Sequence, residues 1–531
     1  MLRIKSILFF GLLILTFLFI QSKISYGQQA QGKTTFNIVD YGAISDGKTL
    51  NTKAIQSAID DANKAKGGKV IFPKGNFLTG SIEIKSDVNI YLEEGAVLLG
   101  STNPDDYKAL VVDGRPVSPK SDDNSQLALV LAQNANNISL SGKGLIDGQG
   151  RALALNIDSL YHLGILKDPN HDNKNSRPSE ISRPKLFRFS ECSQVKIVDL
   201  TIKNAACWGL SFELCSHLII THIALTNRAY WNNDGMDITD CQNVRITDCD
   251  VNAADDGICL KSYYPGHFND SIYIANCTIR SSASAIKFGT ASYGGFKNVT
   301  IKNIKIFDTF RSGIALESVD GGVIENIDIR NIIAVNTGNA IFIRLGNRDG
   351  KVPGVVKNIF IKDVKVQVPF GRPDINYDMR GPEVDFFHNP FPSSIVGLPG
   401  HNVENVILEN IEISYPGRAS KGMAYVSLSR LDQIPEKGKN YPEFSMFGEL
   451  PAWGFYLRHA SGITFKNIKL TLANHDFRPA FVFDNVDSLK MEQIKLPDQG
   501  KKEIILYKTK NEHLDSYAKS AVKSFMPGRE N

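Results

Sequence analysis

The chain has 531 residues, of which 42% are hydrophobic and 22% are charged, and its formal net charge at pH 7 is +4. A charge this close to balance argues against nucleic acid and against an anionic membrane surface as partners. The length alone would suggest about two to four domains, unless internal repeats build one long domain.

The first 27 residues have the features of a secretory signal peptide. Arg3 and Lys5 precede an apolar run over residues 7–20, and small or polar residues follow up to Gly27. The run is too short to span a bilayer stably, and no Cys follows it closely. We therefore expect residues 1–27 to be removed and the mature chain to be exported, to the periplasm or outside the cell, without a membrane anchor.

Residues 28–110 are expected to form an N-terminal cap and the first coils of a larger structure. Within residues 51–66, the apolar residues Ala54, Ile55, Ala58, Ile59 and Ala62 recur at helical spacing. A helix there would cover the apolar mouth of a solenoid and block its open strand edge. We expect its role to be structural.

The central part of the chain repeats the pattern apolar-x-apolar-x-x-apolar-x-apolar. The first five copies begin 23, 26, 28 and 27 residues apart. This period, with two or three short strands per unit, is typical of one turn of a parallel β-helix. We therefore predict an all-β fold, a right-handed parallel β-helix over residues 111–500, and a C-terminal tail over residues 501–531. The copies begin at Val195, Leu218, Val244, Ile272, Val299, Ile359, Val406, Ile463 and Leu489.

Three stretches interrupt the repeat, namely residues 153–183, 369–401 and 427–450. They carry many Pro, Asn and Asp residues. We interpret them as long loops that leave one face of the β-helix, where binding sites tend to collect.

Five of the seven cysteines occupy equivalent places in the repeat. Cys192, Cys215 and Cys241 each stand three residues before a copy, and Cys249 and Cys277 share one position within their copies. Equivalent positions stack about 4.8 Å apart in a parallel coil, which favours interior side-chain ladders. A disulfide or two is the alternative in an oxidising compartment. A metal site is not expected, because no CxxC or His cluster accompanies them.

Two Asp-Gly corners, at residues 234–235 and 256–257, lie 22 residues apart, and each precedes an alternating strand. Aligning the two glycines places Asp234 and Asp256 in one column, with Asp255 one residue earlier. A single Asp-Gly pair is often only a good turn. Three carboxylates that recur at one coil spacing instead indicate a site.

The strands after these corners alternate between inward apolar and outward polar side chains. Ser284 continues the aspartate column in the next coil. Each outward charge is either a substrate contact or a solvated surface charge. Further candidates for sugar subsites are Tyr293, Arg458, His459 and the aromatic run 453–456. For Trp453 and Phe455 we favour ordinary packing over a sugar contact. Alternation turns the following charged side chains outward, beside the aspartates: Asp237, Lys261, Lys287, Glu317 and Arg344.

Three neighbouring carboxylates cannot all ionise easily, because like charges raise at least one pKa. Hydrolysis of a glycosidic bond needs one protonated carboxyl group for the leaving oxygen and one ionised group for water. We expect Asp234 and Asp256 to hold the water and Asp255 to donate the proton. No metal or organic cofactor is implied.

These segments resemble glycoside hydrolase family 28, which includes polygalacturonases and rhamnogalacturonan hydrolases. The family's Asn-Thr-Asp motif appears as Asn232-Asn233-Asp234, and its Asp-Asp pair as Asp255-Asp256. The resemblance implies inversion of the anomeric centre, with Asp255 as the acid and the other two carboxylates placing the water. It covers most of the chain after the leader, including residues 40–49, 95–101, 146–150 and 204–210.

Two motifs of that family are not matched. Ser284 stands where the family's Gly-His-Gly segment has its histidine, and residues 315–317 read Ala-Leu-Glu in place of Arg-Ile-Lys. In polygalacturonases the cations of that second segment grip a galacturonate carboxylate. An acid at Glu317 would repel an anionic sugar at the same subsite, so we expect a rhamnogalacturonan or a galacturonide chain end rather than plain homogalacturonan.

We therefore expect an exported, monomeric, inverting glycoside hydrolase that cleaves an α-glycosidic bond of galacturonate in a pectic polysaccharide. Two alternatives belong to other classes. A calcium-dependent enzyme similar to pectate lyases would share the coil, but would need calcium and an arginine base. A non-catalytic glycan-binding β-helix would have lost one of the three aspartates, whereas this chain retains Asp234, Asp255 and Asp256.

Overall fold

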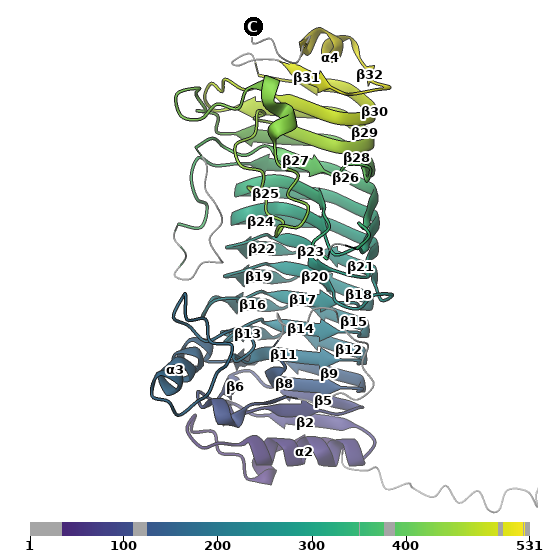
Figure 1. Ribbon diagram of the computed structural model, residues 1–531. Coiled ribbons are helices and arrows are strands. Elements are labelled where there is room, and N and C mark those ends of the chain that lie inside the picture. Colours follow the sequence, from purple (N-terminus) through teal and green to yellow (C-terminus); the bar gives the residue numbers. More distant parts are fainter. Residues whose placement is uncertain are drawn as a thin grey trace, which may run out of the picture.

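The structure is a computed structural model, and it describes residues 34–109, 125–349, 351–375, 377, 388–497, 503–523 and 525. Over these residues the chain winds into one long coil whose strands pair almost entirely in parallel (Figure 1). The predicted right-handed parallel β-helix is confirmed. The expected signal peptide, residues 1–27, lies outside the described residues.

One face of the coil, which we call the site face, is built from short strands that begin after the aspartate corners. Its register is regular where the strands begin, since Met236 pairs with Ile258 and Ile258 pairs with Ile286. Its separate strands are β4 (Ile82–Ile84), β8 (Leu127–Gln133), β11 (Lys185–Ser190), β14 (Leu210–Glu213), β17 (Met236–Thr239), β20 (Ile258–Ser262), β23 (Ile286–Ser292), β27 (Ser393–Val396), β31 (Ile504–Tyr507) and β33 (Val522–Lys523).

Two further faces complete each turn. The second face contains β1 (Thr35–Asn37), β2 (Gly68–Phe72), β5 (Val88–Leu92), β9 (Asn136–Gly142), β12 (Ser193–Val198), β15 (Ser216–Thr221), β18 (Gln242–Thr247), β21 (Asn269–Ala275) and β32 (His513–Leu514). The third contains β3 (Gly75–Thr79), β6 (Ala96–Gly100), β10 (Leu145–Asp147), β13 (Thr201–Lys203), β16 (Ala224–Asn227), β19 (Asp250–Ala253) and β22 (Thr278–Ser281).

Toward the C-terminus, single strands bend around more than one face. They are β24 (Gly295–Ser318), β25 (Val323–Leu345), β26 (Val355–Gln367), β28 (Val403–Tyr415), β29 (Phe455–Leu472) and β30 (Phe481–Lys495). One short strand, β7 (Lys108–Ala109), pairs antiparallel with β8. The coil continues beyond the boundary expected at residue 500, because β31 pairs with β30.

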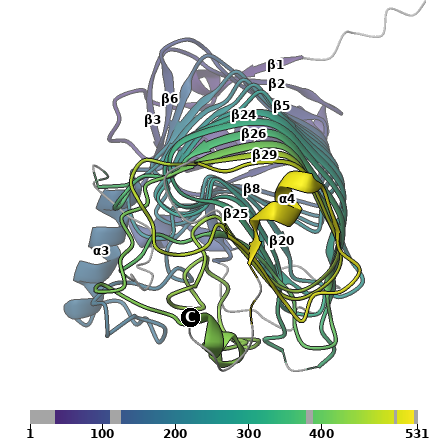
Figure 2. The same cartoon turned by 90° about the horizontal axis from the view of Figure 1, so that it is seen from above.

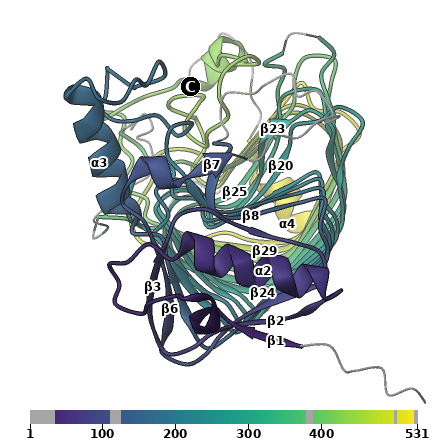
Figure 3. The same cartoon turned by 90° about the horizontal axis from the view of Figure 1, so that it is seen from below.

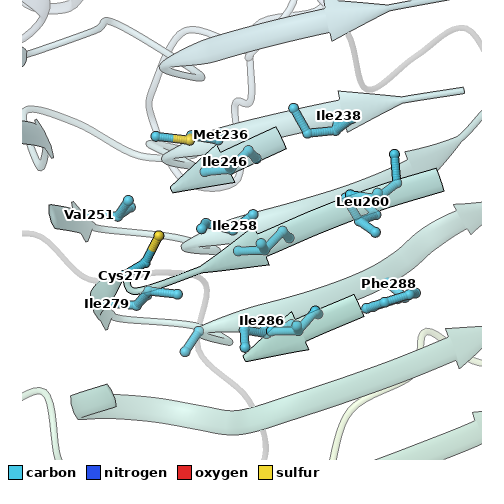
Figure 4. Close-up of a cluster of buried hydrophobic side chains, with 14 of the residues drawn as sticks. Met236, Ile238, Ile246, Val251, Ile258, Leu260, Cys277, Ile279, Ile286 and Phe288 are labelled. Atoms are coloured by element: carbon cyan, nitrogen blue, oxygen red, sulfur yellow. The ribbon is translucent and has the colours of Figure 1, made fainter. Parts of the chain in front are cut away.

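The inward residues of all faces form one continuous apolar core along the coil axis. Figure 4 shows a section in which residues from successive coils, such as Met236, Ile258 and Ile286, lie one above another. Burial of these β-branched and long aliphatic side chains supplies the main favourable free energy of the fold, at roughly 25 cal/mol per Å² of apolar surface. The cysteine ladder is also present, since the backbone N–H of Cys192 donates to Cys215 Sγ and that of Cys215 to Cys241 Sγ, both at 3.4 Å. All seven cysteines are buried and free.

Asparagine side chains form ladders along the outside of two bends between strands. Asn303 donates to Asn276 at 2.9 Å and Asn331 donates to Asn303 at 2.8 Å. These residues adopt left-handed backbone angles, with φ of 57° at Asn276 and at Asn303, which Asn tolerates better than most residues. Asn276 in turn donates to Asp248 Oδ1 at 3.0 Å, so each of these bends is held by an Asn or Asp side chain of the coil before it.

Short helices close both ends of the coil. Helix α2 (Thr52–Lys64) lies across the N-terminal end, where Ile55, Ala58 and Ile59 are buried (Figure 3). The predicted capping helix is thus confirmed. Helix α4 (Ser516–Ala521) lies over the C-terminal end, and Asp515 caps it by accepting a bond from the Ala518 N–H at 2.8 Å (Figure 2).

The three interrupting stretches leave the coil, but the first is not a plain loop. It contains most of helix α3 (Gly150–His162), which buries Leu153, Ala154 and Ile157. The expectation of a loop over residues 153–183 was therefore wrong for its first part, because this apolar spacing builds a helix that packs on the coil. The third stretch contains a short 3₁₀ helix, η3 (Leu428–Gln433). Two further 3₁₀ helices lie nearer the N-terminus, η1 (Ile38–Tyr41) and η2 (Pro104–Asp106).

A second apolar cluster holds the stretch 427–450 against the outer side of the site face. Outward residues of the strands, such as Phe342 and Tyr456, pack there against Phe444 and Phe447. The loop is thus fixed in place by apolar contacts and not only by its two ends.

The core predicts a strong contrast between inward and outward positions of the same residue type. Ile274→Ala removes a side chain that is 1% exposed and should lower the free energy of unfolding by about 2–5 kcal/mol. Ile333→Ala changes a residue that is 48% exposed and should cost less than about 0.5 kcal/mol. Guanidinium unfolding measures both, and equal losses would contradict this assignment of the core.

Candidate active site

The two Asp-Gly corners stack directly, as the repeat predicted. The Gly235 N–H donates to Asp256 O at 2.8 Å, and the Gly257 N–H donates to Ser284 O at 2.9 Å. A Cβ atom on Gly235 would lie only 2.4 Å from Gly257 O. Glycine is therefore required for this close approach of neighbouring corners, which brings Asp234 and Asp256 together.

Three carboxylates meet at this point on the start of the site face. One carboxylate oxygen each from Asp234, Asp255 and Asp256 lies within 4.8 Å of the other two. The residues are 4%, 8% and 3% exposed, respectively, so Asp255 keeps the largest opening to solvent. The backbone N–H of Asp256 donates to Asp255 Oδ1 at 3.0 Å, which orients that carboxyl group.

Two lysines from the following strands reach into this cluster. Lys261 Nζ lies 3.6 Å from Asp234 Oδ2 and 3.4 Å from Asp237 Oδ1, and Lys287 Nζ lies 3.1 Å from Asp256 Oδ2. Ser284 also faces Asp256, since its N–H donates to Asp256 Oδ1 at 3.1 Å. Buried acids are therefore paired with buried ammonium groups, as burial of charge requires.

The three aspartates have different pKa values because their surroundings differ. Burial, together with the charges of Asp234 and Asp256, raises the pKa of Asp255 well above its usual range. Burial and Asp237 likewise raise the pKa of Asp234. Burial also opposes ionisation of Asp256, but Lys287 and the neighbouring cations outweigh it and hold the pKa of that carboxyl group below its usual value. The cluster thus contains one carboxyl group that ionises more easily than usual beside two that hold their protons more strongly than usual.

Two more acids lie in the outward rows beside the cluster. Burial raises the pKa of Asp237 to about 6, against the effect of Lys261. Burial also raises the pKa of Glu317 to about 8, against the effect of Lys287, whose Nζ lies 4.0 Å from Glu317 Oε2. Glu317 is therefore mostly protonated near neutral pH.

The outward charged side chains fall into two rows, where a row is a set of residues aligned across neighbouring strands. Asp237 is aligned with Lys287 through Cys259, whereas Lys261 is aligned with Thr239, one step further along the strand. Glu317 is aligned with Arg344 in this second row. The offset follows from the sequence, because Lys261 stands four residues after the corner at Gly257 and Lys287 stands two residues after the corner at Ala285.

Three side chains expected to contact substrate instead bind other groups of the protein. Arg344 is fully buried and donates to Gly397 O at 2.9 Å and Glu436 O at 2.6 Å. Arg458 Nη2 lies 2.8 Å from Glu436 Oε1, and His459 Nε2 lies 3.0 Å from the same oxygen. These side chains hold the stretch 427–450 in place and lie apart from the aspartates.

Three residues near the cluster were missed by sequence reasoning. Tyr441 accepts a bond from Lys287 Nζ at 3.1 Å, and Glu443 pairs with Arg311. Arg311 could have been found from the repeat, because its N–H donates to Ala283 O in the row that also contains Asp255. Tyr441 and Glu443 carried no such signal, since they lie in the irregular stretch 427–450.

Aromatic side chains near the site fall into two groups. Trp208 lies beside the cluster, with Lys261 Nζ 4.7 Å from its ring centroid. Trp453 and Phe455 belong to the inner core, so the packing predicted for these two residues is confirmed. Tyr293 is only partly buried.

Two groups of three side chains in the described part of the chain could hold a metal ion. One is the aspartate cluster, where Lys261 and Lys287 already supply positive charge. The other consists of Asp158, His162 and His171, on and after helix α3. No helix among the described residues has the length and apolarity needed to cross a bilayer.

Comparison with known proteins identifies related sequences and folds. Residues 64–372, more than half of the chain, match the family model described as "Glycosyl hydrolases family 28". A probable polygalacturonase of Vitis vinifera is 25% identical over 387 residues, which cover 71% of this chain and 69% of that protein. An exo-poly-alpha-D-galacturonosidase of Dickeya chrysanthemi is 26% identical over 438 residues, covering 71% of each.

Two solved structures have a similar fold. The family 28 exopolygalacturonase of Yersinia enterocolitica has a TM-score of 0.61 at 21% identity, covering 88% of this chain and 79% of that chain. An exopolygalacturonase of Thermotoga maritima has a TM-score of 0.57 at 22% identity, covering 72% of this chain and 87% of that one. At these identities the likeness concerns the fold alone.

The raised pKa of Glu317 predicts a pH-dependent stability effect. Glu317 keeps its proton up to about pH 8 when folded but loses it near pH 4.5 when unfolded, so its contribution to stability falls as the pH rises through that window. Glu317→Gln stays neutral throughout. The variant should match the parent at pH 4 and exceed it at pH 9 by on the order of 3 kcal/mol.

Guanidinium unfolding at both pH values measures this difference. Glu404→Gln, at an exposed position, serves as the control and should change stability equally little at pH 4 and pH 9. A stability difference for Glu317→Gln that does not grow with pH would contradict the buried, protonated state of Glu317.

Proposed function

The chain belongs to family 28 of the glycosyl hydrolases, enzymes that act on O-glycosyl bonds, and we propose that it hydrolyses an α-glycosidic bond of galacturonate at the end of a pectic chain. The observation that carries this proposal is the stacked aspartate cluster. In this cluster a carboxyl group with a raised pKa lies beside one with a lowered pKa, and this contrast supports the proposal. Glycoside hydrolysis needs this pair of protonation states.

In this proposal Asp255 is the general acid and Asp256 is the general base. Asp255 holds its proton because it is buried among like charges, and it is the most exposed of the three acids. Asp256 is held ionised by Lys287 and can take a proton from water. Asp234 keeps its proton and orients that water. As water bonds to the anomeric carbon, Asp255 protonates the departing oxygen, so one proton enters the cluster and one leaves it.

We propose inversion of the anomeric centre, although the carboxylates lie closer together than in most inverting enzymes. Their nearest oxygens lie within 4.8 Å, whereas carboxyl groups of inverting glycosidases are usually about 6.5–9.5 Å apart. In this proposal Asp234 and Asp256 hold the water together, and it attacks the sugar ring on the face opposite to the oxygen that Asp255 protonates. Asp255 then acts from the adjacent row.

A pectic substrate is supported by the cations beside the cluster and by the names of related proteins. Lys261 and Lys287 line the outward rows next to the aspartates, and a uronate carboxylate is the sugar group that an ammonium ion binds best. The protonated state of Glu317 removes the repulsion that its ionised form would exert on such a sugar. Relatives include a polygalacturonase and an exo-poly-alpha-D-galacturonosidase.

Action at a chain end is supported by protein segments on both sides of the cluster. On one side, Arg183 donates to Trp231 O at 2.6 Å and to Asn232 Oδ1 at 2.7 Å, which fixes the stretch after helix α3 beside Asp234. On the other side, Tyr441 and Glu443 contact Lys287 and Arg311. A long polymer would have to displace these contacts, whereas a chain end can enter between them. Export and a monomeric state remain predictions from the sequence.

Asp255→Asn should abolish turnover while leaving the fold intact. Asn matches the shape of Asp but cannot donate the proton, so kcat should fall at least about 100-fold with little change in KM. Initial rates on the active pectic substrate and a thermal unfolding curve measure the two effects. Asp250→Asn, an exposed position in β19, is the control. Near-full activity of the Asp255 variant would remove this residue as the acid.

A product profile tests the substrate, the position of cleavage and the stereochemistry together. The protein is incubated with homogalacturonan, rhamnogalacturonan I and rhamnogalacturonan II fragments, and products are followed by chromatography and proton NMR. We expect free galacturonate from chain ends, formed first as the β-anomer. Internal fragments would contradict chain-end action, and an α-anomer formed first would contradict inversion. An unsaturated, ultraviolet-absorbing product whose formation EDTA prevents would contradict hydrolysis.

A further inference from the structure

Helix α3 carries a cluster of side chains that the proposed reaction does not use. The helix lies at the side of the coil (Figures 1 and 3), and Asp158 and His162 are one turn apart on it. His171 returns from the following stretch, so that its Nε2 lies 3.0 Å from Asp158 Oδ1. His162 Nε2 lies 3.5 Å from the same oxygen. One ligand atom from each of the three residues falls within 4.8 Å of the others.

The position of His171 is fixed by its neighbours. Its Nδ1 lies 3.1 Å from Asn173 Oδ1, which can only accept, so Nδ1 carries the proton. Its ring stacks on that of Tyr161 with centroids 3.9 Å apart, and its side chain is only 1% exposed. In the neutral imidazole, the unprotonated Nε2 therefore points at Asp158. Metal-binding histidines are oriented in the same way, with the second ring nitrogen donating to a protein oxygen.

We propose that Asp158, His162 and His171 form a zinc site. Two imidazole nitrogens and one carboxylate oxygen are a ligand set that Zn²⁺ takes in proteins, with a water molecule in the fourth position. Bonds of about 2.0–2.1 Å in a tetrahedral site place ligand atoms roughly 3.3 Å apart, close to the 3.0 and 3.5 Å separations from Asp158 Oδ1. The exposed side of His162 supplies an entry path, since its side chain is 58% accessible.

The site would brace the stretch that borders the aspartate cluster. Residues beyond His171 contact the corner that precedes Asp234, because Arg177 lies over the Trp231 ring at 4.6 Å and Arg183 donates to Trp231 O and Asn232 Oδ1. A metal that joins His171 to helix α3 ties this stretch to a rigid element. The ion has a structural role in this proposal, separate from the chemistry at Asp255.

Zinc binding is measured directly on the full-length, EDTA-treated and tag-free protein. Titration with ZnCl₂ at pH 7.5, followed by isothermal calorimetry and elemental analysis, should give one Zn²⁺ per chain and a raised thermal unfolding midpoint. His162→Ala changes an exposed side chain and should leave the metal-free midpoint unchanged. Loss of this ligand should weaken zinc binding by at least about tenfold. Asp158→Asn, which keeps the shape of the carboxylate, should weaken it similarly.

A matched control is available elsewhere on the surface. His222 Nδ1 lies 3.9 Å from Asp199 Oδ1, its side chain is 63% exposed, and its φ of 54° suits Asn. His222→Asn should bind zinc as the parent does. The proposal is overturned if the parent takes up no zinc at 100 µM, or if His162→Ala and Asp158→Asn bind it unchanged. Zinc uptake that only Asp256→Asn abolishes would place the ion at the aspartate cluster and overturn it as well.

Discussion

The structure depends on exact registration between successive coils. Backbone bonds such as Gly235 N–H to Asp256 O repeat at each corner, and the side chains of each turn lie directly above those of the turn before. Residues 22 positions apart in the sequence thereby become neighbours. A shift of one residue would turn Asp234 and its partners toward the apolar core, so the continuous core and the aspartate cluster are fixed by the same constraint.

This registration also explains how so much charge is buried at one place. Three aspartates and two lysines share the cluster, and each ammonium group lies against a carboxylate. The positive charge is shared unevenly among the aspartates. Lys287 faces Asp256, while Asp255 has no ammonium group within ion-pair distance among the described residues. Different protonation states thus arise among chemically identical side chains because they occupy different rows of the coil.

Regular features of the fold could be read from the sequence, whereas irregular ones could not. The repeat gave the coil, the inward rows and the column of Asp234 and Asp256, because each depends on local alternation and a fixed period. The later divergence of the two strands, where Ser262 pairs with Ser292, follows from a register irregularity that no pattern marks. Tyr441 reaches Lys287 across 154 positions, and only apolar packing of its loop brings them together. Helix α3 was missed because the many Asn and Asp residues of that stretch were interpreted as a loop, although its apolar residues recur at helical spacing.

The asparagine ladders have a consequence for how the chain is assembled. Each asparagine donates to the residue one coil closer to the N-terminus, as Asn331 does to Asn303 and Asn303 to Asn276. The backbone of the same bends bonds in the opposite direction, since the N–H of Asn276 donates to Lys302 O in the following coil. Each bend is therefore held from both sides, and its hydrogen bonds are complete only when the coils before and after it are both in place.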